Sequence, residues 1–107
     1  MTTFDDRERA FEAKFARDAE LEFRITARRN RLVGEWAADR MGLTAEETEA
    51  YARAVVQADF EEPGEQDVIR KLTGDFAAAG IGVDDAEIRT ALNACEEQAR
   101  QHVLRGA

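Results

Sequence analysis

The architecture of this protein follows from residues 3–41, TFDDRERAFEAKFARDAELEFRITARRNRLVGEWAADRM. It holds no proline, and its apolar residues recur at helical spacing, which predicts one long amphipathic α-helix. Thr3 is a suitable N-cap, because its hydroxyl can accept a hydrogen bond from the backbone N–H of Asp6. Gly42 follows where a left-handed residue commonly ends a helix. A single element therefore takes up more than a third of the 107 residues.

Three shorter helices are predicted in the rest of the chain, separated by short loops. Thr44 and Glu47 form a capping box at the start of the second helix, which ends before Pro63-Gly64. The third spans residues 65–79, and Asp84 opens the fourth, which frays near Gly106. Their predicted core faces are Tyr51, Ala54, Val55 and Ala58; Val68, Ile69, Leu72, Phe76 and Ala79; and Ile88, Ala91, Leu92, Cys95, Ala99 and Val103. These patterns predict an all-α fold, a small four-helix bundle of antiparallel neighbours.

The first helix is too long for that bundle. As one rod it would measure ~57 Å at ~1.5 Å per residue, whereas a globule of this chain length is about 30 Å across. Residues 21–41 match the other helices in length and carry Leu21, Ile25, Leu32 and Trp36 on one stripe. We therefore predict an N-terminal helical arm, residues 1–20, that protrudes or is flexible, and a globular four-helix domain, residues 21–107, called the body below.

The arm has an apolar stripe of its own. Phe4, Phe11 and Phe15 lie within ~20° of one line on a helix that turns ~100° per residue, among charged residues of both signs. If the arm folds back, the stripe joins the core. If it protrudes, it is a partner-binding helix that folds on docking. The length mismatch favours the second interpretation.

Charge and composition exclude several classes of protein. The 15 basic and 23 acidic residues give a net charge of −8, which argues against general nucleic-acid binding. One cysteine excludes an internal disulfide and fits a reducing compartment. No apolar stretch is long enough for a membrane span or a signal peptide. Residues 1–42 are neutral on balance, so the net charge lies in residues 43–107. This distribution indicates either chance or two surfaces with different roles.

Residues 3–16, TFDDRERAFEAKFA, resemble the N-terminus of the zeta subunit of the alphaproteobacterial F-type ATP synthase. The resemblance continues through residues 27–30 (ARRN), 32–38 (LVGEWAA), 58–64 (ADFEEPG) and 68–72 (VIRKL), and so covers nearly the whole chain. It implies an inhibitor rather than an enzyme, with an arm that enters a catalytic αβ interface and blocks ATP hydrolysis much more than synthesis. The implied inhibitory interface consists of Phe4, Asp5, Arg7, Glu8, Phe11, Glu12, Lys14 and Phe15.

The resemblance also implies partners and a place in the cell. The partners would be the alpha, beta and gamma subunits of the catalytic head, with no nucleic acid and no insertion into the membrane. The protein would be cytoplasmic, peripheral to the inner membrane through the synthase, and monomeric when free. It would need no cofactor.

Members of this family are linked to weak binding of ATP or ADP, but this chain has no Walker-type glycine loop, so side chains would have to bind the phosphates. The candidates are Arg24, Arg28, Arg29 and Arg31, among which no acidic residue intervenes. Arg24, Arg28 and Arg31 share one helix face. That face is either a phosphate site or a solvated basic surface paired with acidic helices. A small helical nucleotide sensor is thus the alternative function, and an interaction domain for an unrelated partner is a third.

The remaining polar clusters indicate no further site. Glu61, Glu62, Glu65 and Asp67 lack a calcium-loop pattern, so a solvated acidic turn is expected. Cys95 and His102 share a helix face but lack further ligands, and Cys95 is expected in the core. No residue set indicates catalysis.

Overall fold

The computed structural model describes the backbone of residues 3–61 and 64–106, and their side chains except those of residues 3–6, 11, 15, 60 and 61. Within these residues the chain forms only helices: α1 (Thr3–Arg40), α2 (Ala45–Glu61), α3 (Glu65–Ala78) and α4 (Asp85–Gly106). The predicted all-α fold is confirmed, and the helix ends agree with the prediction to about one residue.

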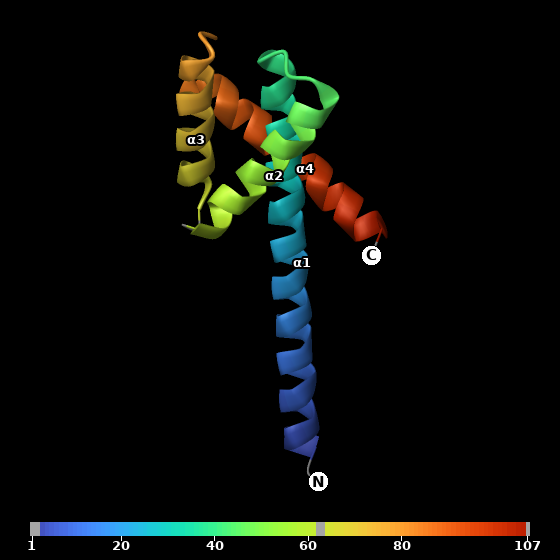
Figure 1. The fold of residues 1–107 in the computed structure, drawn as a ribbon. Coiled ribbons are helices and arrows are strands. Elements are labelled where there is room, and N and C mark those ends of the chain that lie inside the picture. The colour runs from blue at the N-terminus through green and yellow to red at the C-terminus, as the bar shows by residue number, and fades with distance from the viewer. Residues whose placement is uncertain (1–2, 62–63, 107) are drawn as a thin grey trace.

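Helix α1 extends far beyond the helices that pack on it. Helices α2 and α4 cross its C-terminal half obliquely, and α3 packs against both of them (Figure 1). The N-terminal half projects from the body, so the molecule measures 64 × 24 × 21 Å. The described side chains of residues 7–20 are all exposed. In this structure the arm does not fold back, whereas the division between residues 20 and 21 stays a prediction.

The turn between α1 and α2 is held by hydrogen bonds that the sequence predicts. Gly42 has a φ of 70°, and the backbone N–H of Leu43 donates to the carbonyl of Ala38 at 3.0 Å. This left-handed cap satisfies a carbonyl at the end of α1. The Thr44 N–H donates to Glu47 Oε1 at 2.9 Å, and the Glu47 N–H donates to Thr44 Oγ1 at 3.2 Å. The capping box is therefore confirmed.

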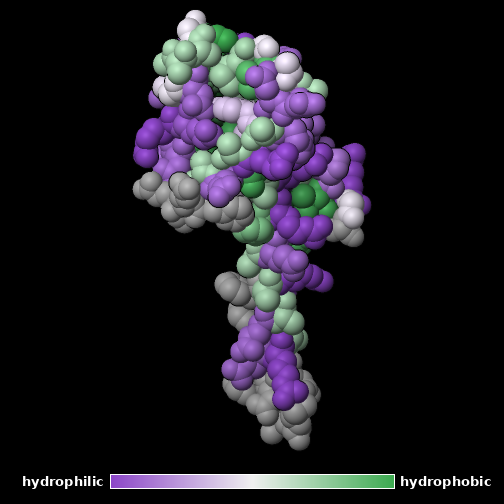
Figure 2. Space-filling model, viewed as in Figure 1, coloured by the Kyte–Doolittle hydropathy of each residue, from purple (hydrophilic) through white to green (hydrophobic). Residues whose placement is uncertain are grey.

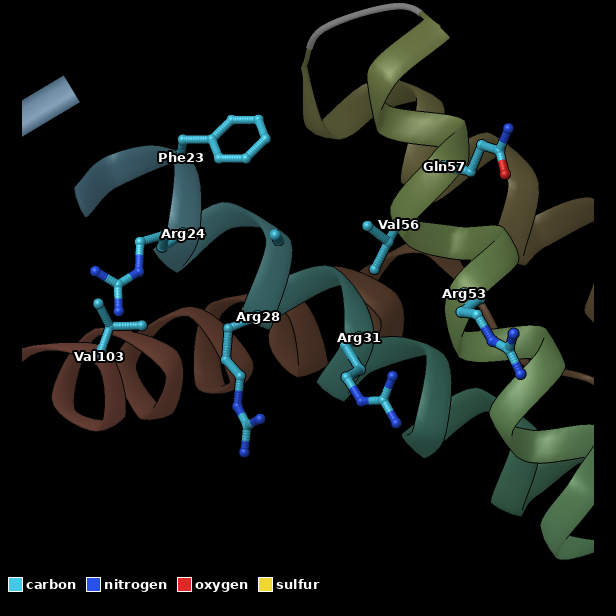
Figure 3. A pocket seen from close by; sticks show the side chains of 9 residues that line it. Phe23, Arg24, Arg28, Arg31, Arg53, Val56, Gln57 and Val103 are labelled. Atoms are coloured by element: carbon cyan, nitrogen blue, oxygen red, sulfur yellow. The ribbon is translucent and has the colours of Figure 1, made fainter. Parts of the chain in front are cut away.

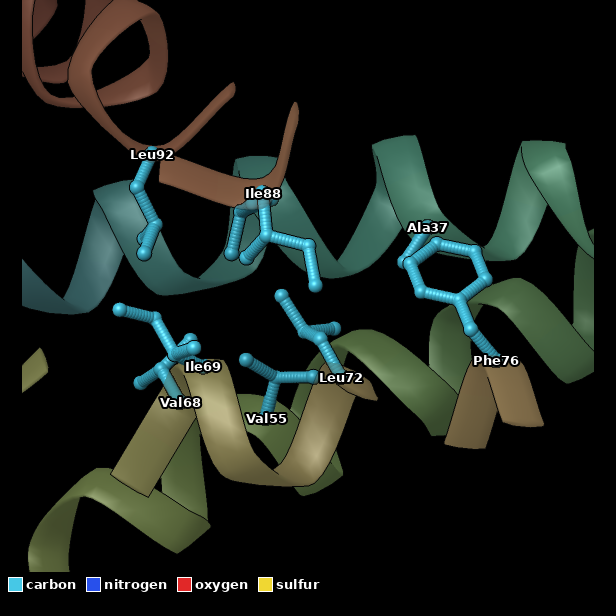
Figure 4. Packing of buried hydrophobic residues seen from close by; sticks show 9 residues of the cluster. Ala37, Val55, Val68, Ile69, Leu72, Phe76, Ile88 and Leu92 are labelled. Atoms are coloured by element: carbon cyan, nitrogen blue, oxygen red, sulfur yellow. The ribbon is translucent and has the colours of Figure 1, made fainter. Parts of the chain in front are cut away.

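The body has one main hydrophobic core, shown in part in Figure 4. Its buried residues are Val33, Ala37, Val55, Val68, Ile69, Leu72, Phe76, Ile88 and Leu92. Ala54 and Ala79 are exposed, so their predicted place in the core is wrong. On α2 the buried residues are Ala52 and Val55, and Ala54 is turned about 160° from the first and about 100° from the second. Helix α3 ends at Ala78, which leaves Ala79 as its C-cap.

A second cluster joins α1 to α4 near the base of the arm. Ile25, Ala99 and Val103 are buried there, and Leu21 and Leu32 pack against them. In the main cluster Trp36 and Cys95 are partly buried, which confirms the packing role expected for Cys95. Burial raises the pKa of the Cys95 thiol, so this side chain stays protonated and apolar.

Gly34 allows α1 and α2 to approach closely. A Cβ at this position would lie 2.9 Å from the Cα of Ala52 and 3.3 Å from Cγ2 of Val55. Backbone atoms at such a distance cannot move aside without shifting α2. The glycine is therefore required by the packing of the two helices, although it weakens α1 itself.

Replacing Gly34 by alanine loses about 1–3 kcal/mol of stability from overpacking and gains ~1 kcal/mol in helix propensity, so we expect a net loss of up to about 2 kcal/mol. Gly74 of α3 is the matched control, because a Cβ there meets nothing within 4 Å. Gly74→Ala is expected to stabilise by about 0.5–1 kcal/mol. Urea unfolding of both variants checks this, and midpoints that rise equally would contradict the packing role.

A polar contact links α2 to α3. The Tyr51 hydroxyl donates to Asp75 Oδ2 at 2.6 Å, and Lys71 Nζ lies 3.1 Å from the same carboxylate oxygen. The Lys71 ammonium also lies 5.2 Å from the centroid of the Tyr51 ring. Burial, together with the hydrogen bond and charge of Asp75, raises the pKa of the Tyr51 phenol above its ordinary value.

This raised pKa predicts a loss of stability at high pH. In the unfolded protein the Tyr51 phenol ionises at pH ~10. The contribution of Tyr51 to the free energy of unfolding is therefore complete below that pH and is lost as the pH rises above it. Tyr51 is the only tyrosine in the chain, so phenolate absorbance reports it alone. We expect the native protein to resist ionisation until it unfolds. Ionisation near pH ~10 with circular dichroism unchanged would contradict the prediction.

Candidate functional site

The arm presents its described charged residues to solvent. Arg7, Glu8, Glu12 and Lys14 of the predicted interface are exposed. Figure 2 shows hydrophilic and mildly hydrophobic residues mixed along the projecting half of α1. The side chains of Phe4, Asp5, Phe11 and Phe15 lie outside the described residues, so the phenylalanine stripe stays a prediction.

Helix α4 braces the base of the arm. Arg100 donates to both carboxylate oxygens of Glu22, at 2.9 and 3.1 Å, and Leu21 packs on the second hydrophobic cluster. The hydrogen bond from Arg100 lowers the pKa of the Glu22 carboxyl. Because both partners are exposed, the pair contributes little to stability. It joins the first turn of the body part of α1, next to the arm, to α4.

An open groove of about 740 Å³ lies on the body next to the base of the arm, between α1, α2 and α4 (Figure 3). We call it the arginine groove. It is lined by Phe23, Arg24, Ala27, Arg28, Arg31, Arg53, Val56, Gln57 and Val103. Arginines therefore surround a floor made largely of apolar side chains.

The arginine groove carries more positive than negative charge. Arg31 and Arg53 both pair with Glu49, at 2.5 and 3.9 Å. Within the described part of the chain, no acidic side chain pairs with Arg24 or Arg28. The Arg28 Nε is buried and finds no acceptor among the described residues. An acceptor on a bound group would satisfy this buried donor.

The structure separates Arg29 from the other candidate arginines. It is 7% exposed and donates from Nε and Nη2 to Oδ1 of Asn30, at 3.1 and 2.9 Å. Its Nη1 lies 3.7 Å from a carboxylate oxygen of Glu96 on α4. Arg24, Arg28 and Arg31 meet at the groove, whereas Arg29 joins α1 to α4. Arg29 and Arg31 thus pair with acidic side chains of other helices, whereas no such pair is described for Arg24 or Arg28, and the choice between a phosphate site and a paired basic surface stays a prediction.

Phe23, Arg53 and Val56 belong to the groove and were not predicted from the sequence. Phe23 is a large apolar residue that is 55% exposed. The sequence offers one signal for it, since it directly precedes the arginine cluster. No spacing pattern connects Arg53 or Val56 to that cluster, because they lie on another helix and only packing brings them close.

The other candidate clusters form no further site. Glu65 pairs with Arg89 of α4 at 3.4 Å. Asp67 pairs with Arg70 at 3.1 Å, but its side chain is only 12% exposed, so the expected solvated turn is wrong for Asp67. Glu61 and Glu62 of that turn lie outside the described side chains. Cys95 and His102 line different pockets. Among the residues that the structure describes, no three potential ligands gather for a metal ion, and no helix is long and apolar enough to cross a membrane.

Comparison with known proteins agrees with this architecture. The family model of the ATPase inhibitor subunit zeta matches residues 1–102. A protein structure determined by solution NMR is 37% identical, with a TM-score of 0.71 over 81% of this chain and 99% of that chain. No curated protein matches significantly. The match over nearly the whole length, arm included, confirms the resemblance seen in the sequence. The chain therefore belongs to the family of ATPase inhibitor zeta subunits.

Proposed function

We propose that this protein inhibits ATP hydrolysis by the F-type ATP synthase by inserting its arm into a catalytic αβ interface near the gamma subunit. The observation that carries the proposal is the projecting half of α1, whose described side chains are all exposed. Family membership supports the inhibitory role. The arm residues of the predicted interface, from Phe4 to Phe15, would make the contacts.

The physical chemistry of the arm supports this mode of binding. An isolated helix of this length is marginal in water, and ordering it on binding must be offset by anchors. Phenylalanines on one face supply apolar area, and charges of both signs can pair with the polar walls of a cleft. The body remains outside and fixes the base of the arm through Leu21 and Glu22.

In this role the protein is cytoplasmic, peripheral to the inner membrane through the synthase, and monomeric when free. It acts as an inhibitor and catalyses no reaction of its own. The decisive experiment measures ATP hydrolysis by the purified cognate synthase with and without the full chain. We expect strong, saturable inhibition of hydrolysis and a smaller effect on synthesis. Unchanged hydrolysis at saturating protein would overturn the proposal.

The arginine groove favours a second candidate function, weak binding of ATP or ADP. Arginine side chains bind phosphates through charge-assisted hydrogen bonds, and Arg24 and Arg28 lack acidic partners in the described part of the chain. The apolar floor, with Phe23 at its edge, offers a surface for an adenine ring. We propose no cofactor besides this weakly bound nucleotide.

Titration of ATP and ADP into the variant Arg24→Ala/Arg28→Ala tests this candidate. Each lost charge-assisted hydrogen bond is worth about 1.5–3 kcal/mol. We therefore expect the affinity for ATP and ADP to fall about tenfold or more. Arg29 is left intact because its buried contacts hold α1 to α4. Arg70→Ala/Arg89→Ala, which removes two exposed arginines outside the groove, is the control. Equal affinities for the two variants would remove the groove as the nucleotide site.

A further inference from the structure

We propose that the arginine groove is a second docking surface for the ATP synthase and that it receives an acidic segment of the catalytic head with an apolar side chain at its centre. This inference rests on the proposed inhibitory function and deepens it. It assigns to the body a direct part in recognition, besides that of holding the arm.

The position of the groove argues for contact with the same partner as the arm. Phe23 and Arg24 lie within about one helical turn of residue 20, on the same uninterrupted helix. A partner that contacts the arm as far as residue 20 therefore also lies next to the groove. Val103 brings α4 to this place, close to the Glu22–Arg100 pair.

The charge of the groove argues for an acidic occupant. Four arginines line it, and the described residues supply one paired carboxylate, that of Glu49. Arg28 Nε adds a buried donor that lacks an acceptor among the described residues. Carboxylates of a partner would satisfy these groups and gain from their excess charge. The positive charge is confined to the groove, because the net charge of the whole chain is −8.

The spacing of the arginines fits a protein segment. Figure 3 shows Arg24, Arg28 and Arg31 following one another along α1, with Arg53 beyond them on α2. The first three are separated by four and three residues and so extend over ~10 Å of helix. Acidic residues at the same three- and four-residue steps on a partner helix would face them one by one. A nucleotide carries its charge at one end and would leave part of this row unpaired.

The floor of the groove argues for an apolar anchor within the acidic segment. Phe23 is 55% exposed, and Ala27, Val56 and Val103 line the groove beside it. Apolar surface enclosed by arginines is typical of protein interfaces, in which a buried anchor is surrounded by polar contacts. The groove is also open rather than enclosed, unlike most small-molecule sites.

Charge reversal in the full chain tests the proposal. The variant Arg24→Glu/Arg28→Glu is compared with the control Arg70→Glu/Arg89→Glu, which changes the net charge equally on exposed residues outside the groove. The measured quantity is the protein concentration that half-inhibits hydrolysis by the cognate synthase, at two salt concentrations. We expect the groove variant to need about tenfold more protein and to lose much of the salt dependence. The control should stay close to the unmodified protein.

A photo-crosslinking residue at Gln57, an exposed position on the groove wall, provides a test with an otherwise native groove. We expect crosslinks to a segment of the head rich in aspartate and glutamate. Crosslinks to a basic segment, or none in an inhibited complex, would overturn the proposal.

The outcomes separate this inference from the proposals it builds on. If the unmodified protein inhibits and the groove variant inhibits equally well, the docking surface is wrong while the inhibitory function stands. If that variant also loses ATP binding, the groove belongs to the nucleotide. If the unmodified protein fails to inhibit, both the inhibitory function and the docking surface are overturned.

Discussion

Deletion of residues 1–18 is expected to abolish inhibition of ATP hydrolysis and to leave the body folded. The described side chains among residues 7–18 are exposed, and the first described side chain that packs on a hydrophobic cluster is that of Leu21. The deletion therefore removes no described core contact. An isolated helical segment of this length contributes little stability in water, so the thermal midpoint should move only slightly.

The measurements are circular dichroism, thermal unfolding and the hydrolysis assay with the cognate synthase. Deletion of residues 105–107 is the control, since Arg105 and Gly106 are exposed and the arm stays intact. We expect this control to inhibit like the full chain. A truncated protein that lacks the arm and still inhibits equally would disprove the arm as the inhibitory element. In that case the body would have to carry the inhibition.

Leu72→Ala is expected to cause the largest loss of stability among the single changes considered. Leu72 is completely buried in the main core, between the helices that pack on α1. Truncating a buried leucine to alanine loses about 2–5 kcal/mol, because apolar burial is lost and a cavity remains. A domain of this size has a free energy of unfolding of about 5–15 kcal/mol. The variant should therefore melt on the order of 10 °C lower or more.

Leu104→Ala is the matched control, because the same substitution removes a side chain that is 57% exposed. Its expected effect lies within about 0.5 kcal/mol. Urea and thermal unfolding of the two variants give the comparison. At temperatures where Leu72→Ala is folded, its inhibition should match that of the full chain, since Leu72 lies in neither the arm nor the groove. Equal stability losses in both variants would contradict the assignment of the core.

Much of the fold follows from local sequence features. Thr44 and Glu47 begin α2 through hydrogen bonds within four residues, and Gly42 ends α1 through bonds to the preceding turn. Such signals can be predicted because both partners are neighbours in the chain. The surplus length of α1 was also predictable, since it follows from helical rise and the size of a globule.

The candidate site was predictable only in part. The spacing of Arg24, Arg28 and Arg31 places them on one face, and all three line the groove. Arg29 is their neighbour in sequence but is buried against α4. The excess charge of the groove depends on Arg53 and on which acids pair elsewhere. These are contacts between residues distant in the chain, and helical periodicity carries no information about them.

The helices, their ends and the surplus length of α1 could all be read from the sequence, and so could the family. The first three depend on residues close together in the chain or on chain length, so local hydrogen bonding and helix geometry suffice, whereas the family follows from motifs spread along the chain. Only the packing of the helices shows that Gly34 meets Ala52, that Arg29 is buried, and that four arginines line a groove at the base of the arm. Those features arise where α2 and α4 cross α1, because the crossing selects which side chains meet.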